Sequence, residues 1–218
     1  PTEPIINPSL PQNNPQNPST QSTVLEIIAT ESDYFTANGF KNYALALSTT
    51  INKTEESRVS QKYKKLIGLD PKLSAEQKDS LIGFILYGSS SSKILGEGER
   101  AGVVNSYFEA YGRLPLEQTQ WQDVLKISNG RWPTERNQAK ENKAKLIFKK
   151  VYNREANLKN NIDENAIMVM AYGLIPAKRN LNSEAVAMKT FRWLYNRVPQ
   201  SASDWNTVRA IAYSGAKR

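Results

Sequence analysis

From Val24 onward, apolar residues recur at the three- and four-residue spacing of amphipathic helices, and short polar segments containing glycine or asparagine separate the apolar runs. The pattern predicts a lead-in helix that begins near Val24 and ends before "ANG" at 37–39, where Asn or Gly can adopt the left-handed conformation that ends a helix. A second lead-in helix is predicted from Phe40 to about Ser48. Helical periodicity continues to the end of the chain, and it predicts an all-α fold.

Four pairs of predicted helices follow the lead-in, and each pair has similar signals for the end of a helix. The first helix of each pair ends at an anchor residue, and the anchors are separated by 44, 41 and 43 residues: Ile67, Tyr111, Tyr152 and Tyr195. Periods of about 34 to 47 residues are typical of two-helix solenoid repeats. The sequence therefore predicts four tandem helical hairpins of about 41–44 residues in a short solenoid-like stack. The predicted helix pairs are 55–67 with 75–87, 99–111 with 119–129, 140–152 with 162–172, and 183–195 with 203–213.

The stretches "YGRLPLEQTQW" at 111–121 and "YNRVPQSASDW" at 195–205 carry Tyr, Arg, Pro and Trp at the same offsets. This recurrence is predicted to be structural. The residues after the four anchors are of the types that adopt left-handed backbone at helix ends, namely Gly68, Gly112, Asn153 and Asn196. Capping boxes are predicted at Ser74 with Gln77 and at Ser201 with Asp204. Trp121 and Trp205 fall on the apolar stripe of the second helix, so both are predicted to be core residues.

Composition separates an N-terminal arm from the rest of the chain. Residues 1–22, "PTEPIINPSLPQNNPQNPSTQS", hold six of the 11 prolines, which block helix and sheet, and only Ile5, Ile6 and Leu10 offer apolar anchors. The predicted organisation is a disordered arm at 1–22, a helical lead-in at 23–54, and repeats at about 55–96, 97–138, 139–181 and 182–218. The segment "YGSSSSKILGEGER" at 87–100 lacks the order of a phosphate-binding loop and is predicted to be a flexible connection.

The residue types present exclude several kinds of chemistry. The chain has no Cys and no His, which removes disulfides, Cys or His metal sites, thiol nucleophiles and His-based triads. We therefore expect no cofactor, no metal and no enzymatic activity. The 21 acidic residues are scattered, and Glu97 and Glu99 fall in the predicted flexible connection. A surface glycan-acting enzyme with paired carboxylates is the weakest alternative, because carboxylates from distant positions can converge in space.

A formal net charge of +8 favours polyanions such as nucleic acid or anionic cell-wall polymer. The candidate polyanion contacts cluster on and just before the first helix of the third repeat: Arg136, Lys140, Lys143, Lys145, Lys149 and Lys150. A solvated helix face explains the same lysines, and no aromatic residue is interleaved with them for base stacking. Arginine recurs two residues after three of the anchors, as Arg113, Arg154 and Arg197. One explanation is a ladder of guanidiniums along the repeats that binds an anionic polymer. The other is that each arginine interacts with the negative end of a helix dipole and with a carboxylate of the next repeat. The second explanation is favoured.

The first helix of the fourth repeat has two apolar sides. Ala185, Met188, Phe191 and Tyr195 form the expected core stripe. Val186 and Trp193, with Thr190 between them, form another at about 100° or more around the helix. Because exposed apolar patches mark interaction surfaces, Val186 and Trp193 are the candidate interface for self-association, in a head-to-tail contact that forms a ring or a filament. The competing explanation is that the lead-in helices near 24–48 fold over this face.

The segments "GERAGVVNSYFEAYGRLP" and "NGRWP", then "FKKVYNRE" and "VMAYGLIPAKRN", and finally "AIAYSGA" resemble a tandem helical-hairpin repeat of uncharacterised exported proteins from candidate-phylum bacteria with reduced genomes. The resemblance covers about 97–218 and, more loosely, 55–96. It implies export and a bacterial surface setting, and it carries over no catalytic residue.

We therefore expect a non-catalytic, exported structural or interaction protein, extracellular or at the bacterial cell surface, and self-assembling as a filament or surface-layer subunit. The alternative is a polyanion-binding module. The chain begins at Pro1 without a Met, which suggests a processed form or a fragment from which a signal or anchor is already gone, and no stretch is apolar for long enough to span a bilayer.

Overall fold

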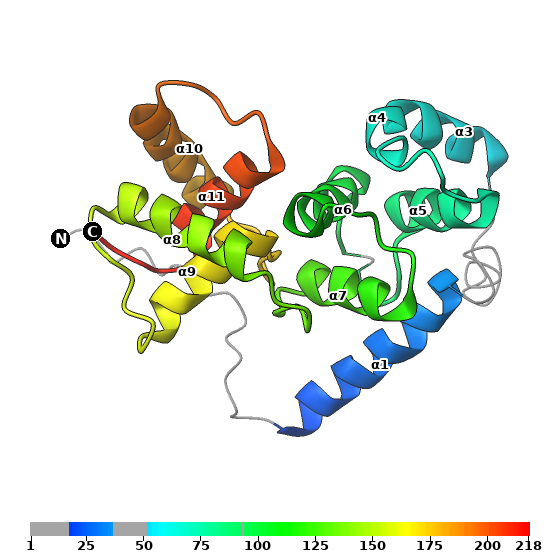
Figure 1. Cartoon of the computed structure of the whole chain (residues 1–218), viewed down its shortest axis with the longest axis horizontal. Coiled ribbons are helices and arrows are strands. Elements are labelled where there is room, and N and C mark those ends of the chain that lie inside the picture. Colours follow the sequence, from blue (N-terminus) through cyan, green and yellow to red (C-terminus); the bar gives the residue numbers. More distant parts are fainter. Residues whose placement is uncertain (1–17, 37–51, 93) are drawn as a thin grey trace. The chain divides into compact units, whose positions relative to one another are not determined.

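The computed structural model describes residues 18–36, 52–92 and 94–218. Among these residues there are ten helices and no strands, so the all-α prediction is confirmed for this part of the chain (Figure 1). The described chain divides between Asn129 and Gly130 into two compact units. The predicted second lead-in helix and the anchors Ile5, Ile6 and Leu10 lie outside the described residues.

The unit that ends at Asn129 contains two helical hairpins and a lead-in helix. Its helices are α1 (Pro18–Thr36), α3 (Lys53–Lys62), α4 (Lys64–Ile67), α5 (Ala75–Tyr87), α6 (Glu97–Tyr111) and α7 (Gln118–Ser128). The first hairpin pairs α3 and α4 with α5, the second pairs α6 with α7, and α5 packs on α6. α1 packs along α7 and also contacts α5 (Figure 1). It begins at Pro18, inside the segment predicted as an arm, because proline is compatible with the first helical position.

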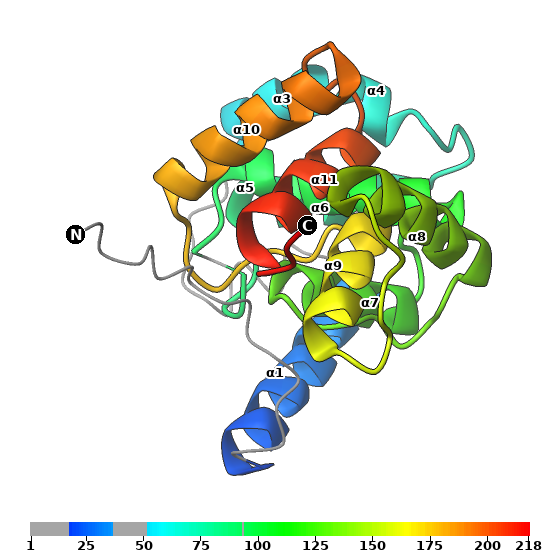
Figure 2. The same ribbon diagram turned by 90° about the vertical axis from the view of Figure 1, so that its left-hand side faces the viewer.

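The unit that begins at Gly130 contains the other two hairpins. The third hairpin pairs α8 (Gln138–Tyr152) with α9 (Asn161–Tyr172), and the fourth pairs α10 (Leu181–Tyr195) with α11 (Ala202–Tyr213). α9 also packs on α11, which joins the two hairpins through their second helices, and α10 lies along α11 in both views (Figures 1 and 2). The sequence "AIMVMAY" makes α9 apolar on all sides, and every one of these residues is buried. α9 is therefore the centre of this unit's core.

Local capping chemistry explains where the helices begin and end. Both predicted capping boxes are present, at Ser74 on α5 and at Ser201 on α11. Left-handed backbone ends the first helix of the last three hairpins, at Gly112, Asn153 and Asn196. The same prediction is wrong for Gly68, whose φ of −82° is right-handed. The Gly68 amide instead donates to the carbonyl oxygen of Lys64, which continues the hydrogen-bond pattern of α4.

Trp121 and Trp205 differ sharply in burial although both are the fourth residue of a second helix. Trp121 is 1% exposed, stacked on Phe35 of α1 at 4.6 Å between ring centroids and edge-on to Phe84 of α5 at 5.5 Å. Trp205 is 48% exposed, so the prediction that it is a core residue is wrong. The position faces outward from its own hairpin, and Trp121 is buried because α1 covers it.

The serine-rich segment after α5 is an ordered docking point for α1, which corrects the prediction of a flexible connection. Ser89 and Ser92 are buried and hydrogen bonded to each other. The carboxylate of Glu31 on α1, which is 3% exposed, accepts hydrogen bonds from the hydroxyls of Ser90 and Ser91 and from the Ser91 amide. The segment therefore satisfies a buried carboxylate and holds α1 against the two hairpins.

Candidate functional site

A hydrogen-bonded tyrosine closes each hairpin of the second unit. In the third hairpin the amide of Asn137, the N-cap of α8, donates to the Tyr172 hydroxyl at 2.7 Å, and this hydroxyl donates to Glu141 at 2.6 Å. Arg136 donates to both oxygens of the same carboxylate. The hydrogen bonds from Arg136 hold the pKa of Glu141 below its usual range, although burial opposes the shift. We call this arrangement the tyrosine latch.

The fourth hairpin repeats the latch with equivalent residues. The Asn180 amide donates to the Tyr213 hydroxyl at 2.9 Å, the hydroxyl donates to Glu184 at 2.6 Å, and Arg179 donates to both carboxylate oxygens. Burial raises the pKa of Tyr213 to about 12. Burial alone would also raise the pKa of Glu184, but the hydrogen bonds from Arg179 and Tyr213 outweigh it and the pKa is lowered.

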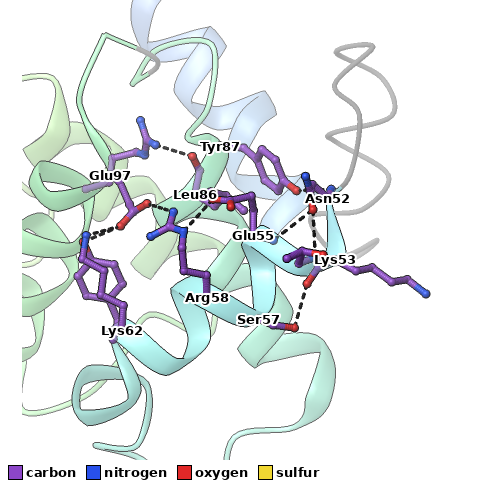
Figure 3. Close-up of polar contacts among 12 residues, drawn as sticks. Asn52, Lys53, Glu55, Ser57, Arg58, Lys62, Leu86, Tyr87 and Glu97 are labelled. Carbon is purple, nitrogen blue, oxygen red and sulfur yellow. Dashed lines mark hydrogen bonds and ion pairs between the residues drawn. The ribbon is translucent and has the colours of Figure 1, made fainter.

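The latch varies in the first two hairpins. In the first, the Asn52 amide donates to the Tyr87 hydroxyl at 2.9 Å (Figure 3). In the second, Arg100 occupies the position of Glu141 and donates to the carbonyl oxygens of Ile85 and Leu86. The predictions made from the sequence do not include the latch. Its signal is visible there as "RNQAKE" at 136–141 and "RNLNSE" at 179–184.

The recurring arginines after the anchors are tied to the hairpins to which they belong. Arg154 pairs with Asp163, which is buried at the start of α9, and Arg197 pairs with Asp204 at the start of α11. Each arginine lowers the pKa of its carboxylate by hydrogen bonding. The carboxylates belong to the same repeat, which corrects the expectation that the next repeat supplies them. These pairs link the two helices of one hairpin and account for the two arginines structurally.

Glu97 and Glu99 are also structural, because α6 begins at Glu97. Glu97 accepts hydrogen bonds from Arg58 and Lys62 of α3 and from Tyr63 (Figure 3). Arg58 is the largest cause that lowers the pKa of Glu97, to about 2. Glu99 accepts from the Gly96 amide and caps the helix. The prediction that these two carboxylates lie in a flexible connection is therefore wrong, because Glu97 joins α6 to α3 and Glu99 caps α6.

The candidate polyanion residues lie on or just before α8, and several already have partners. Arg136 belongs to the latch and stacks over Trp132, with its guanidinium carbon 5.4 Å from the ring centroid. Lys149 pairs with Glu155, and the Lys150 Nζ lies 4.0 Å from the centroid of the Tyr195 ring. Lys145 is within 3.4 Å of Asn142, whereas the Lys143 side chain is exposed and Lys140 is half-buried in the first turn. Polyanion binding by this group stays a prediction.

The outer side of α10 exposes the two candidate interface residues. Val186 is 61% exposed and Trp193 is 70% exposed, one above the other on the same helix face. Val186 lines an open hollow of about 370 Å³ that continues onto Ile211 and Ala212 of α11. The Arg218 guanidinium stacks over Trp193 at 4.9 Å, and Lys189 lies beside them in a second hollow of about 430 Å³. We call this surface the end face: Val186, Lys189, Trp193, Ile211 and Arg218.

The competing explanation placed the lead-in helices over this face. α1 instead packs on α7 and α5, where Phe35 covers Trp121 and Ile28 is buried. Its apolar side is therefore used within its own unit. The predicted second lead-in helix lies outside the described residues, so the explanation is corrected for α1 only.

Two positions on the third hairpin indicate which neighbour packs on the side of a hairpin that corresponds to the end face. Met170, the tenth residue after the N-cap of α9, is 1% exposed, and α9 packs on α11 of the next hairpin. Lys150, the thirteenth after the N-cap of α8, covers Tyr195 of the next hairpin. The equivalent positions in the fourth hairpin are Ile211 and Trp193. The end face is therefore the side of a hairpin on which the following hairpin packs.

The described residues contain no cluster of three or more His, Cys, Asp or Glu side chains placed to bind a metal ion. No helix within the described ranges is both long enough and apolar enough to cross a membrane. No family model, curated protein or solved structure matches this chain.

Proposed function

We propose that this chain is a non-catalytic structural and interaction protein that docks a second copy of itself through the end face of its fourth hairpin. The observation that carries the proposal is the exposure of Val186 and Trp193 on the side that, one hairpin earlier, packs on a following hairpin. Burial of a Val or a similar apolar side chain contributes about 1.5–3 kcal/mol, so this surface favours association.

The ionic groups support a non-catalytic role because their contacts fix the fold. Glu141 and Glu184 serve the latches, Asp163 and Asp204 pair with arginines of their own hairpins, and Glu97 joins α3 to α6. Each of these carboxylates has a lowered pKa, which suits a permanently ionised structural partner. A general acid would need a raised pKa.

The proposal includes the solenoid-like order of the four hairpins, which the packing of successive hairpins within each unit supports. It also includes an extracellular or cell-surface location and assembly into a filament or surface layer. The resemblance to repeats of exported bacterial proteins supports the location.

Light scattering of the parent chain against concentration tests the proposal. We expect the mass of the parent to grow with concentration and that of Trp193→Glu to stay at the monomer value. Leu146→Glu is the matched control, because Leu146 of α8 is also 70% exposed but lies outside the end face. Equal assembly by Trp193→Glu and the parent would contradict the proposal. A monomer that binds a polyanion with a steep salt dependence would support the alternative.

A further inference from the structure

The side of a hairpin that receives the end face can be identified within the second unit. Arg209 of α11 donates to the carbonyl oxygen of Gly173, which closes the preceding hairpin, and to the side chain of Asn206. This side of α11 therefore faces the preceding hairpin. Counted from the N-caps Ser201 and Ser74, Arg209 and Asn206 correspond to Ile82 and Asp79 of α5.

In the first hairpin these positions are partly exposed. Asp79 and Ile82 are only half-buried, and they line a hollow of about 440 Å³ between α5 and α3. The α3 residues around it are Lys53, Glu56, Ser57, Ser60 and Gln61. We call this surface the receiving hollow. By the count from the N-caps, it lies at the helix positions that in the fourth hairpin face the third.

The two surfaces are complementary in charge and in apolar content. The end face places Lys189 and Arg218 beside Trp193, whereas the residues that line the receiving hollow include Ile82, two acidic residues, Glu56 and Asp79, and one basic residue, Lys53. Opposite charges across an interface steer encounter and fix its register. Pairing of two end faces would instead set Lys189 and Arg218 against their own copies, and like charges disfavour such contacts.

We propose that the end face of one copy docks into the receiving hollow of another, so that copies associate head to tail in the way that the fourth hairpin packs on the third. This inference rests on the proposed function, because it requires the end face to be a docking surface. The two surfaces differ, so the contact is heterologous and generates rings or open filaments. The occupant of the end face is therefore the Glu56, Asp79 and Ile82 surface of a second copy.

A mixing experiment with two blocked variants tests this geometry. Trp193→Glu blocks the end face. Ser57→Lys/Gln61→Lys adds two positive charges to the receiving hollow at exposed positions, and lysine has a helix propensity equal to that of glutamine and better than that of serine. Asn142→Lys/Leu146→Lys on α8 is the charge-matched control, also exposed and one helical turn apart. Circular dichroism establishes that each variant is folded before its mass is measured.

We expect each blocked variant alone to associate at least about tenfold more weakly than the parent, because like charges then face each other or a charge replaces the apolar anchor. An equimolar mixture should form dimers and nothing larger, since only one end face and one receiving hollow per pair remain open. The control should assemble as the parent does.

Three results would overturn the inference, and they separate it from the proposed function. Assembly of Ser57→Lys/Gln61→Lys at the parent's concentrations, with Trp193→Glu monomeric, would refute the head-to-tail geometry and leave the end face as a docking surface. Parent-like assembly of Trp193→Glu alone would refute both. A parent chain that stays monomeric at every concentration would refute docking between copies altogether.

Discussion

Trp121 and Trp205 occupy the same position of equivalent helices, yet the structure predicts unequal costs for their removal. An aromatic side chain buries roughly 150–250 Å², which at about 25 cal/mol per Å² corresponds to about 4–6 kcal/mol for complete burial. Trp121 is 1% exposed, and Trp121→Ala should cost about 3–5 kcal/mol, the usual range for a buried aromatic. Trp205 is 48% exposed, so Trp205→Ala should cost about half of the transfer energy at most, or ~2 kcal/mol.

Urea unfolding measures this difference in free energy. The two tryptophans lie in different units, so unfolding is followed by circular dichroism as well as fluorescence, and each unit is fitted separately if two transitions appear. Trp121→Phe is the matched control, because it keeps most of the aromatic contact with Phe35 and should lose less than Trp121→Ala. Equal losses for Trp121→Ala and Trp205→Ala, or a larger loss for Trp205→Ala, would refute the conclusion that α1 buries one position and leaves the other open.

Three further predictions concern polar contacts. Tyr172→Phe should lower the free energy of unfolding in urea by about 1–3 kcal/mol, because it leaves buried latch partners unsatisfied. Tyr195→Phe, at a half-buried anchor, should lower it by less, and equal losses would argue against the latch. The lowered pKa of Glu97, about 2, contributes stability that is present above pH 4.5 and lost as the pH falls toward 2, and Glu97→Gln should flatten that dependence in acid titrations; an unchanged slope would contradict this. Glu31→Ala should speed hydrogen exchange of α1 amides relative to those of α9, and unchanged exchange would show that the serine segment does not hold α1.

Most helix ends could be predicted from the sequence because the signals are local. The helix predicted at 75–87 matches α5, and the capping boxes at Ser74 and Ser201 form as predicted. Gly68 was mispredicted for the same local reason, since glycine also accepts the right-handed turn that closes α4. Residue type alone does not distinguish these two ways to end a helix.

Burial and partner choice could not be predicted in the same way because they depend on segments far apart in the chain. Trp205 carries the same local pattern as Trp121, and the packing of Phe35 of α1 and Phe84 of α5 on Trp121 distinguishes them. The serine segment appeared flexible because its partner, Glu31, lies on α1. The exposed side of α10 could be predicted because periodicity within one helix places Val186 and Trp193 together, whereas the receiving hollow needs α3 and α5 in contact.

The most direct test of the central claim measures whether a second copy covers the end face. The chain has no cysteine, so Val186→Cys introduces a single thiol at the end face and Leu146→Cys introduces one on α8 as the control. Alkylation by a maleimide is timed across a concentration series in which light scattering follows the mass. The account predicts that the Val186→Cys thiol becomes protected as the mass rises while the Leu146→Cys thiol reacts at a constant rate. A Val186→Cys thiol that reacts equally fast in the monomer and in the assembled state would contradict the claim that the end face docks a second copy.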